Sequence, residues 1–142
     1  MISFVELHTS ATFASIRVMN DMLDVALRGL AVGEPLRHDL ALGLAELVAN
    51  VCEHEGEGCS SAREVRVRLE VGPEELRLTV SSAGPRFDLE AALRRAAEHD
   101  PLAELDGHGL GLPLLVGLFD AVDHAYEELA GNRITLRKRR VA

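Results

Sequence analysis

Apolar residues recur every three or four positions over residues 10–30 and again over 35–55, a spacing that predicts two amphipathic helices. Ser10 or Thr12 suits the N-cap of the first helix, because a short side-chain oxygen there accepts a bond from a helical N–H group. The Gly-Glu-Pro sequence at 33–35 predicts the turn between the helices. In the second helix one apolar stripe is expected to face a sheet, and it consists of Leu36, Leu40, Leu44, Leu47 and Val51.

Elsewhere apolar and polar residues alternate, which is the pattern of a strand with one buried face. The segments 64–71 and 75–82 alternate strictly and flank Gly72–Pro73, so they predict a β-hairpin. A short helix is expected over about 88–98, and a further helix after the glycines at 107–111. The remaining strand candidates are 2–8, 121–129 and 132–139.

The resulting order of elements is β-α-α-β-β-α-loop-α-β-β. Short connections favour antiparallel pairing of successive strands, and the helices then collect on one face of the sheet. We therefore predict an α+β fold, a two-layer sandwich in which helices cover one face of a mainly antiparallel, mixed sheet. A chain of 142 residues has the size of one domain, which is expected over residues 1–142.

The composition of the chain argues against several classes of function. The net charge of −8 argues against nucleic acid as a partner, because a nucleic-acid binder carries a basic face. No segment approaches the roughly 20 apolar residues of a membrane span. No signal peptide is recognisable in residues 1–10, so a cytoplasmic location is expected. In that reducing compartment Cys52 and Cys59 are expected to be free thiols.

A run of glycines, Gly107, Gly109 and Gly111, directly precedes an apolar segment. Glycine is a poor helix former, so its repeated use where a helix begins needs a reason. One interpretation is a loop with a flexible hinge. The other is a backbone that approaches a phosphate closely and then presents the N–H groups of a helix N-terminus to it.

The second predicted helix carries a polar stripe beside its apolar stripe, formed by Glu46, Asn50 and Glu53. Asn50 is a weak helix former at a mid-helix position. The stripe is typical of the solvated flank of a helix. It also suits a site in which Glu46 acts as a general base and the Asn50 carbonyl oxygen holds a hard cation.

A third segment, Ser81–Asp88, ends a predicted strand, and Gly84–Pro85 imposes a turn there. A glycine at such a place lets a planar ligand lie against the backbone. Taken alone, the segment is a strand that ends in a turn. Together with the polar stripe and the glycine run, in this order along the chain, it forms a specific combination.

This combination resembles the histidine-kinase-like (Bergerat-fold) ATPases, and more narrowly the anti-sigma-factor serine/threonine kinases of bacterial partner-switching systems. The N-box of that family has Glu and Asn four residues apart followed by a Glu-His pair, and this chain matches it with Glu46, Asn50, Glu53 and His54. The second glycine box, G-x-G-L-G-L, matches residues 107–112 at every position. With the closing "GNRITLRK", the resemblance covers nearly the whole chain.

The resemblance implies binding of ATP with Mg²⁺. It implies that Glu46 polarises an attacking hydroxyl or water and that Asn50 ligates Mg²⁺. Gly84 would lie against adenine, Phe87 would close the first glycine box, and the region from Phe87 to Gly107 would form a lid over ATP. The phosphates would be wrapped by Gly107, His108, Gly109, Leu110, Gly111 and Leu112.

The sequence departs from the family in the first glycine box, D-x-G-x-x-F. Here Ser82 stands in place of the aspartate that accepts a hydrogen bond from adenine. Serine is neutral and shorter, so it reaches the base only through a water or after a shift of the base. The change is expected to weaken adenine binding by on the order of 1 kcal/mol. Asn132, near the adenine pocket in the family's topology, is a candidate for a replacement amide.

The resemblance implies an ATP-dependent protein kinase for serine or threonine that acts as a partner-switching regulator, with a protein partner like an anti-sigma antagonist or a sigma factor. Because of Ser82, two alternatives stay open: a nucleotide-poor relative that works as a protein-binding switch, and a stand-alone ATPase module. The family also pairs near its first strand. Since Ile2, Phe4 and Val5 form an apolar strand there, a homodimer is expected unless the first helix covers that strand.

Overall fold

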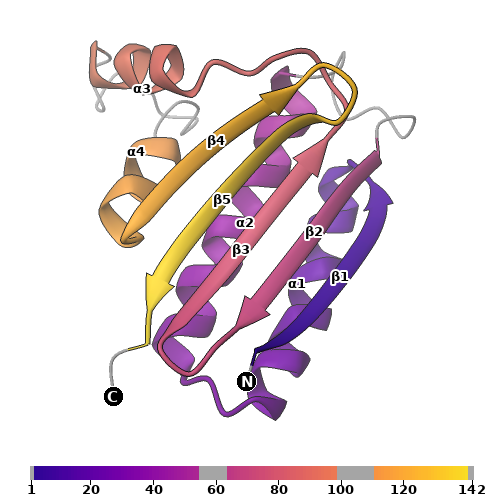
Figure 1. Cartoon of the computed structure of the whole chain (residues 1–142), viewed down its shortest axis with the longest axis vertical. Coiled ribbons are helices and arrows are strands. Elements are labelled where there is room, and N and C mark those ends of the chain that lie inside the picture. The colour runs from indigo at the N-terminus through magenta and orange to yellow at the C-terminus, as the bar shows by residue number, and fades with distance from the viewer. Residues whose placement is uncertain (1, 55–63, 99–110, 141–142) are drawn as a thin grey trace.

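The computed structural model describes residues 2–54, 64–98 and 111–140. The strands form one antiparallel sheet in the order β1-β2-β3-β5-β4, which Figure 1 shows in front of the helices. The elements are β1 (Ser3–Ser10), α1 (Phe13–Gly29), α2 (Glu34–His54), β2 (Glu64–Val71), β3 (Glu75–Ser82), α3 (Leu89–Glu98), α4 (Gly111–Leu118), β4 (Ala121–Glu127) and β5 (Gly131–Arg139).

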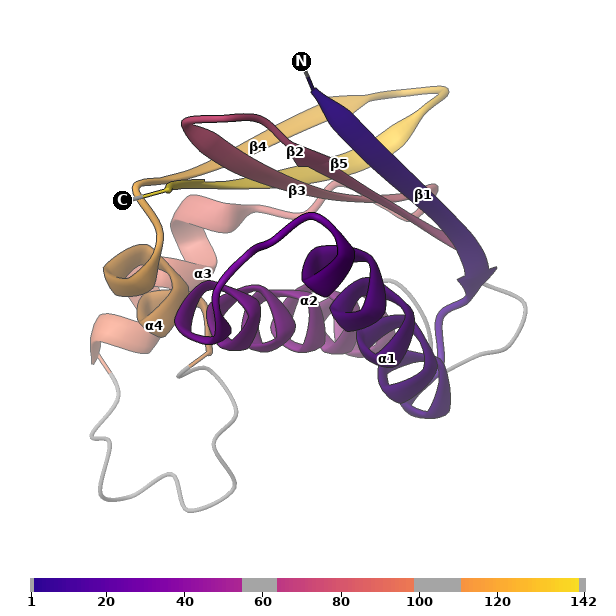
Figure 2. The ribbon, with the colours of Figure 1, turned by 90° about the horizontal axis from the view of Figure 1, so that it is seen from below.

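The helices lie on one face of the sheet, and no described helix covers the other face (Figure 2). Every pairing between neighbouring strands is antiparallel, and the strands β1 and β4 form the two edges. The predicted α+β fold, with helices on one face of a mainly antiparallel sheet, is confirmed, but the sheet is not mixed, because the described strands pair only antiparallel.

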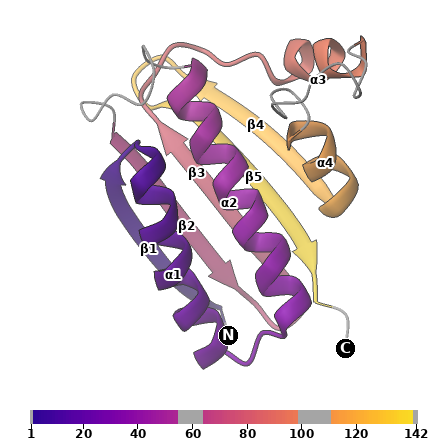
Figure 3. The same cartoon turned by 180° about the vertical axis from the view of Figure 1, so that it is seen from behind.

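The core lies between the inner face of the sheet and α2, which runs across β3 in the view from behind (Figure 3). Alternation turns every second side chain of β2 and β3 into this core. At Gly43 of α2 an added methyl group would lie 2.7 Å from Leu136 Cδ1, so the helix packs closely against β5. The predicted apolar stripe is confirmed, with Leu36 partly buried and the others buried: Leu40, Leu44, Leu47 and Val51.

The start of α1 agrees with the sequence prediction, and the turn that follows its end differs from it. Thr12 is the N-cap, since its Oγ1 accepts from the Ser15 N–H group at 3.1 Å and the Ser15 hydroxyl accepts in return. The turn to α2 comes earlier than predicted, with Ala31 in the left-handed region at φ 58°. The reason is tertiary: Val32 is buried and its N–H group bonds back to Leu27 of α1.

The expectation that Cys52 is a free thiol is wrong, because Cys52 is joined in a disulfide. The expectation came from the compartment alone, which carries no information on whether a given sulfur has a partner within reach. Cys59 lies outside the described residues, and the cytoplasmic location stays a prediction. None of the described helices is both long and apolar enough to cross a membrane.

Strand β1 is covered on its inner face only. Val5 is partly buried and packs against the core, whereas Ile2 and Phe4 are 61% and 56% exposed on the outer face. The guanidinium of Arg68 lies over the Phe4 ring, 4.1 Å from its centroid. The apolar patch expected at the first strand is therefore smaller than predicted, because alternation turns Val5 away from it.

Candidate functional site

The C-terminal end of α2, the end of β3 and the start of β5 lie at the same end of the molecule, at the top of Figure 1. Strand β3 ends at Ser82, which is paired with Asn132 near the start of β5. This end of the molecule holds most of the predicted site residues that the structure describes.

Glu46 and Asn50 lie one turn apart on α2, and both are partly buried. The residue that follows each of them in the sequence is buried in the core, so the helix has little freedom to rotate. A carboxylate and an amide are thus held at the border between core and solvent. Glu53 and His54 belong to the last turn of the same helix, but their side chains are outside the described part of the structure.

The end of β3 offers small and uncharged groups. Ser82 is 5% exposed, and the strand's alternation turns it to the inner face, as it does Val80. After the strand, Gly84 is buried and Phe87 is buried with the core. The segment from Ser82 to Phe87 therefore combines a hydroxyl, a glycine backbone and an aromatic ring at one end of the sheet.

Asn132, 4% exposed, holds the segment that follows β3. Its Nδ2 group donates to the Pro85 carbonyl at 2.6 Å and lies 3.4 Å from the Gly84 carbonyl. Its Oδ1 accepts from the Phe87 N–H group at 2.8 Å. The amide that sequence reasoning assigned to a base is thus bonded to the protein's own backbone, and it shapes the loop 84–87.

Gly131 belongs to none of the predicted site segments, yet this glycine sets how closely β5 approaches β3. Its φ is +84°, and an added Cβ would lie 2.1 Å from the Ser82 carbonyl oxygen and 2.6 Å from Ala83 Cα. Only glycine permits this approach. The available signal was the Gly-Asn pair after a polar turn, which by itself indicates a hairpin connection.

The predicted phosphate-binding box is described only at its end. A helix begins at Gly111, as the glycine run predicts, and Leu112 is partly buried. Residues 107–110 lie outside the described part of the chain, so their role stays a prediction. Helix α3 occupies the first part of the region predicted as a lid, and Asp88 caps it by accepting from the Ala91 N–H group at 2.9 Å.

Lys138, near the other end of β5, holds the C-terminal end of α4. Its Nζ lies 2.9 Å from Asp39 Oδ2 on α2 and donates to the Leu118 carbonyl. It also lies 5.7 Å from the centroid of the Phe119 ring. A cation suits a helix C-terminus, where the carbonyl groups lack helical partners. The position of α4 is thereby fixed against α2 and the sheet.

The groups at the C-terminal end of α2 and at the end of β3 suit a polyphosphate nucleotide. Among residues 2–54, 64–98 and 111–140 no group of three or more His, Cys, Asp or Glu side chains is placed to hold a metal ion. Mg²⁺ in nucleotide sites commonly takes one or two protein ligands and completes its coordination with phosphate oxygens and water, an arrangement that a cation at Asn50 would suit. The loop 84–87, in which the one charged side chain, Arg86, is exposed, offers a place for a base, and the polar stripe of α2 offers a place for metal-bound phosphates.

Comparison with known proteins points the same way. A sequence profile for the histidine kinase-like ATPase domain matches residues 9–138. Among solved structures, a chain in the SiaB–SiaC complex from Pseudomonas aeruginosa is similar, with a TM-score of 0.62 and 17% sequence identity. The match covers 96% of this chain and 88% of that chain, and at this identity it shows the fold alone. No curated protein sequence matches.

Proposed function

Because the chain belongs to the histidine kinase-like ATPase family, we propose that it binds ATP with Mg²⁺ and phosphorylates a serine or threonine of a regulatory protein partner. The family match over residues 9–138 is the observation that carries nucleotide binding. The kinase activity rests on the N-box residues of α2 and on the resemblance to anti-sigma-factor kinases.

In this proposal the polar stripe of α2 does the chemical work. Asn50 would hold Mg²⁺, which offsets the negative charge of the triphosphate. Glu46, one turn earlier, would accept the proton of the attacking hydroxyl. Phosphoryl transfer depends on positioning and charge neutralisation more than on covalent help from the protein. Two side chains held at the border of the core fit that requirement.

The remaining site residues would bind the nucleotide without reacting. Residues 107–112 and the start of α4 would bind the phosphates through backbone N–H groups. Glu53 and His54 would border the same site at the end of α2. The loop 84–87 would contact the base, with the hydroxyl of Ser82 beneath it.

A protein partner is part of the proposal, by analogy with a similar structure. The solved chain of similar fold was crystallised in a complex of two proteins. We assign the partner here to the class of anti-sigma antagonists or sigma factors, as the resemblance implies, in the cytoplasm and without nucleic acid or membrane as a ligand. A net charge of −8 agrees with that assignment.

A protein-binding switch without turnover is the second candidate, and Ser82 is the observation that favours it. A buried serine in place of a carboxylate removes a charge-assisted bond to the base, so nucleotide binding loses affinity. Retention of both Glu46 and Asn50 favours the kinase, because a pure binding module needs neither. Turnover of ATP distinguishes the two candidates.

The test compares wild type with two variants in ATP binding and turnover. Glu46→Gln is expected to leave ATP binding nearly intact and to remove turnover, because it loses the base and keeps the shape. Asn50→Ala is expected to abolish the Mg²⁺-dependent part of ATP binding and to spare Mg²⁺-free binding. Glu34→Gln, an exposed residue at the other end of α2, is the matched control and should behave as wild type. Equal loss of both kinds of binding in Asn50→Ala would make Asn50 a structural residue.

We also propose a homodimer that pairs through β1. Ile2 and Phe4 are exposed on the outer face of this edge strand, where no described helix covers them. Apolar side chains on an edge strand favour pairing with a second copy. Sedimentation at micromolar concentration should show a dimer that Phe4→Glu dissociates, and a wild-type monomer would refute the proposal.

A further inference from the structure

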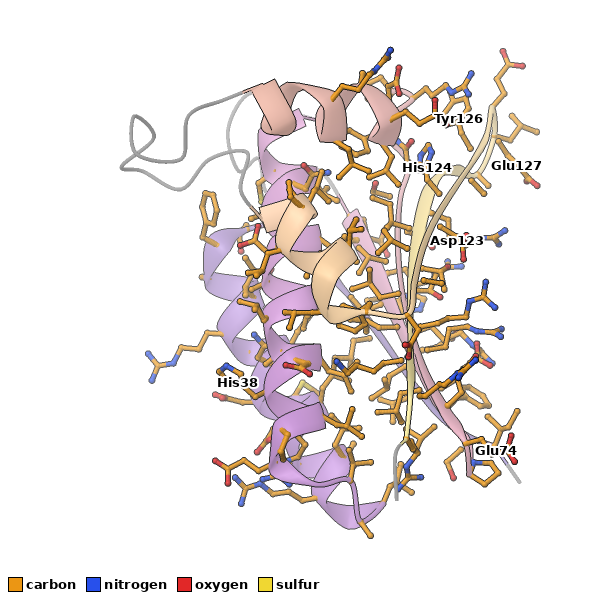
Figure 4. All side chains as sticks on the ribbon, turned by 90° about the vertical axis from the view of Figure 1, so that its left-hand side faces the viewer. His38, Glu74, Asp123, His124, Tyr126 and Glu127 are labelled. Carbon is orange, nitrogen blue, oxygen red and sulfur yellow. The ribbon has the colours of Figure 1, made fainter. Side chains whose placement is uncertain are left out.

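We propose that His124 is a positioning residue of the nucleotide site, acting through Asn132 on the loop 84–87. Its Nε2 atom lies 3.0 Å from Asn132 Oδ1. Figure 4 shows His124 on β4 at the end of the sheet near α3. No sequence motif includes this histidine, and it comes from an edge strand outside the three segments that build the site. The inference rests on the proposed nucleotide binding and adds a residue to it.

The orientation of the Asn132 amide follows from its partners. Two carbonyl oxygens, of Gly84 and Pro85, lie at one side of the amide and require its NH₂ group there. The Phe87 N–H group lies at the other side and requires the oxygen. An amide oxygen only accepts hydrogen bonds, so Oδ1 is also the acceptor toward His124.

The contact therefore excludes one neutral tautomer of the imidazole. Oδ1 cannot donate, so the 3.0 Å contact is a hydrogen bond only when Nε2 of His124 carries a proton. The opposite neutral tautomer would place a nitrogen lone pair against the amide oxygen. With Nε2 protonated, each of these four contacts of the Asn132 amide joins a donor to an acceptor.

A second contact joins the same histidine to the same loop. The rings of His124 and Phe87 meet edge to face, with centroids 6.1 Å apart and an interplanar angle of 86°. His124 thus acts on Phe87 twice, directly through the ring and indirectly through Asn132, which binds the Phe87 N–H group. The histidine links the edge strand β4 to the loop proposed to contact the base.

Loss of the contact between His124 and Asn132 is expected to change the affinity for ATP and to leave the phosphoryl-transfer step unchanged. Loss of the Nε2 donor leaves Asn132 Oδ1 with one bond fewer and loosens the loop 84–87, while Glu46 and Asn50 on α2 stay in place. An effect on the base alone raises the apparent KM for ATP and leaves kcat unchanged, because base contacts are equal in ground and transition states. A general structural role would lower both.

The test uses two variants at the same position and one matched control. His124→Phe keeps a ring against Phe87 and removes the donor, and is expected to raise the Kd and KM for Mg-ATP by about three- to tenfold with kcat within about twofold of wild type. His124→Gln keeps a side-chain N–H donor and should restore the affinity to within about twofold of wild type. His8→Phe, at an exposed histidine of β1, controls for a change of histidine to phenylalanine on the opposite edge strand of the sheet.

A second readout needs no nucleotide. Nitrogen NMR of the ligand-free protein should show a proton on Nε2 of His124. The same proton should be present in the His8→Phe variant and after nucleotide is added. A neutral tautomer with the proton on Nδ1, or equal ATP affinity in wild type and His124→Phe, would overturn the positioning role. Failure of wild type to bind any nucleotide would contradict the proposed function instead, and the tautomer would still report on the contact itself.

Discussion

The two ends of β5 bring polar side chains into the core in different ways. Near its start, Asn132 is a neutral amide that is almost fully buried and bonds to backbone groups and His124. Near its end, Lys138 is charged, keeps 22% of its side chain exposed, and pairs with Asp39. A neutral amide can leave water completely once its donors and acceptors are bonded, whereas a charge is held close to solvent.

The two ends of β5 are expected to have different roles for the same reason. The start of β5, with its neutral buried amide, holds the loop that we assign to the base, where a fixed shape matters; the one charged side chain of that loop, Arg86, is exposed. The charged end fixes the position of α4 relative to α2, through a cation at a helix C-terminus. We therefore expect substitutions at the start of β5 to change nucleotide binding and stability, and those at its end to change stability alone.

Gly131→Ala should have the largest effect, because it breaks the close approach at the start of β5. An added Cβ would lie 2.1 Å from the Ser82 carbonyl oxygen, and φ is +84°, where alanine is disfavoured. We expect a loss of roughly 2–4 kcal/mol in the free energy of unfolding, measured by urea denaturation, together with weaker ATP binding.

Gly117→Ala on α4 is the matched control. Apart from its chain neighbours and the backbone of its own helix, no atom of the described residues lies within 4 Å of a Cβ added at Gly117. Gly117 is the next-to-last residue of α4, where alanine is expected to leave stability unchanged or to raise it by up to about 1 kcal/mol. If Gly131→Ala were as stable as wild type, the contact between the start of β5 and the end of β3 would not exist as described.

Lys138→Met tests the charged end and should have the second largest effect. It leaves the partly buried carboxylate of Asp39 without its cation and the Leu118 carbonyl without its donor. We expect about 1–3 kcal/mol lower unfolding free energy, with ATP affinity changed by less than about threefold. The double variant with Asp39→Asn should recover part of this loss. A large loss of ATP affinity would mean that both ends of β5 serve the nucleotide site.

Ser82→Asp sharpens the comparison by placing a charge at the neutral end. If Ser82 stands where the base is bound, a carboxylate there should tighten ATP binding by roughly tenfold, about 1.4 kcal/mol, in calorimetric titration. The free protein should become less stable, since Ser82 is buried and an unpaired carboxylate is costly there. Unchanged or weaker ATP binding would mean that the pocket is rebuilt, and the protein-binding switch would become the better account.

Asp24→Asn removes an ion pair that lies away from β5 and serves as a reference for the other variants. Its effect on stability should be the smallest. The hydrogen bond from Arg28, with help from Arg37, lowers the pKa of Asp24 below its usual value. A lowered pKa in the folded state stabilises the protein above the unfolded pKa of about 4, and the contribution is lost as pH falls through the folded pKa.

At neutral pH we expect Asp24→Asn to lower Tm by about 2 °C or less, and by nothing at a pH below the folded pKa. Thermal melts at neutral and acidic pH measure the difference between variant and wild type. A larger fall at neutral pH than that caused by Lys138→Met would contradict the ranking of exposed and partly buried pairs.

Much of the fold was predictable because periodicity reports which side of an element is buried. The alternation in 64–71 and 75–82 and the apolar stripe of α2 led directly to the hairpin and the helix that forms the core. The left-handed residue Ala31 was not predictable, since burial of Val32 decides where the chain turns. The free thiol expected at Cys52 was wrong because that expectation rested on the compartment alone.

The site was predictable only where a motif lies within one segment. Glu46 and Asn50 follow from their spacing on one helix, and that spacing does place them one turn apart. The bond between Asn132 and Phe87 joins residues 45 positions apart, and the role of His124 depends on the same long-range contact. Such contacts arise from strand pairing in three dimensions, and a single sequence carries no signal for them.

Calorimetric titration of the wild-type protein with Mg-ATP, Mg-ADP and Mg-GTP tests the central claim most directly. We expect Mg-ATP and Mg-ADP to bind with one site per chain, and the Mg²⁺-dependent part of ATP binding to disappear in Asn50→Ala and to persist in Glu34→Gln. Absence of binding by all three nucleotides at millimolar concentration would contradict the claim that this end of the sheet is a nucleotide site.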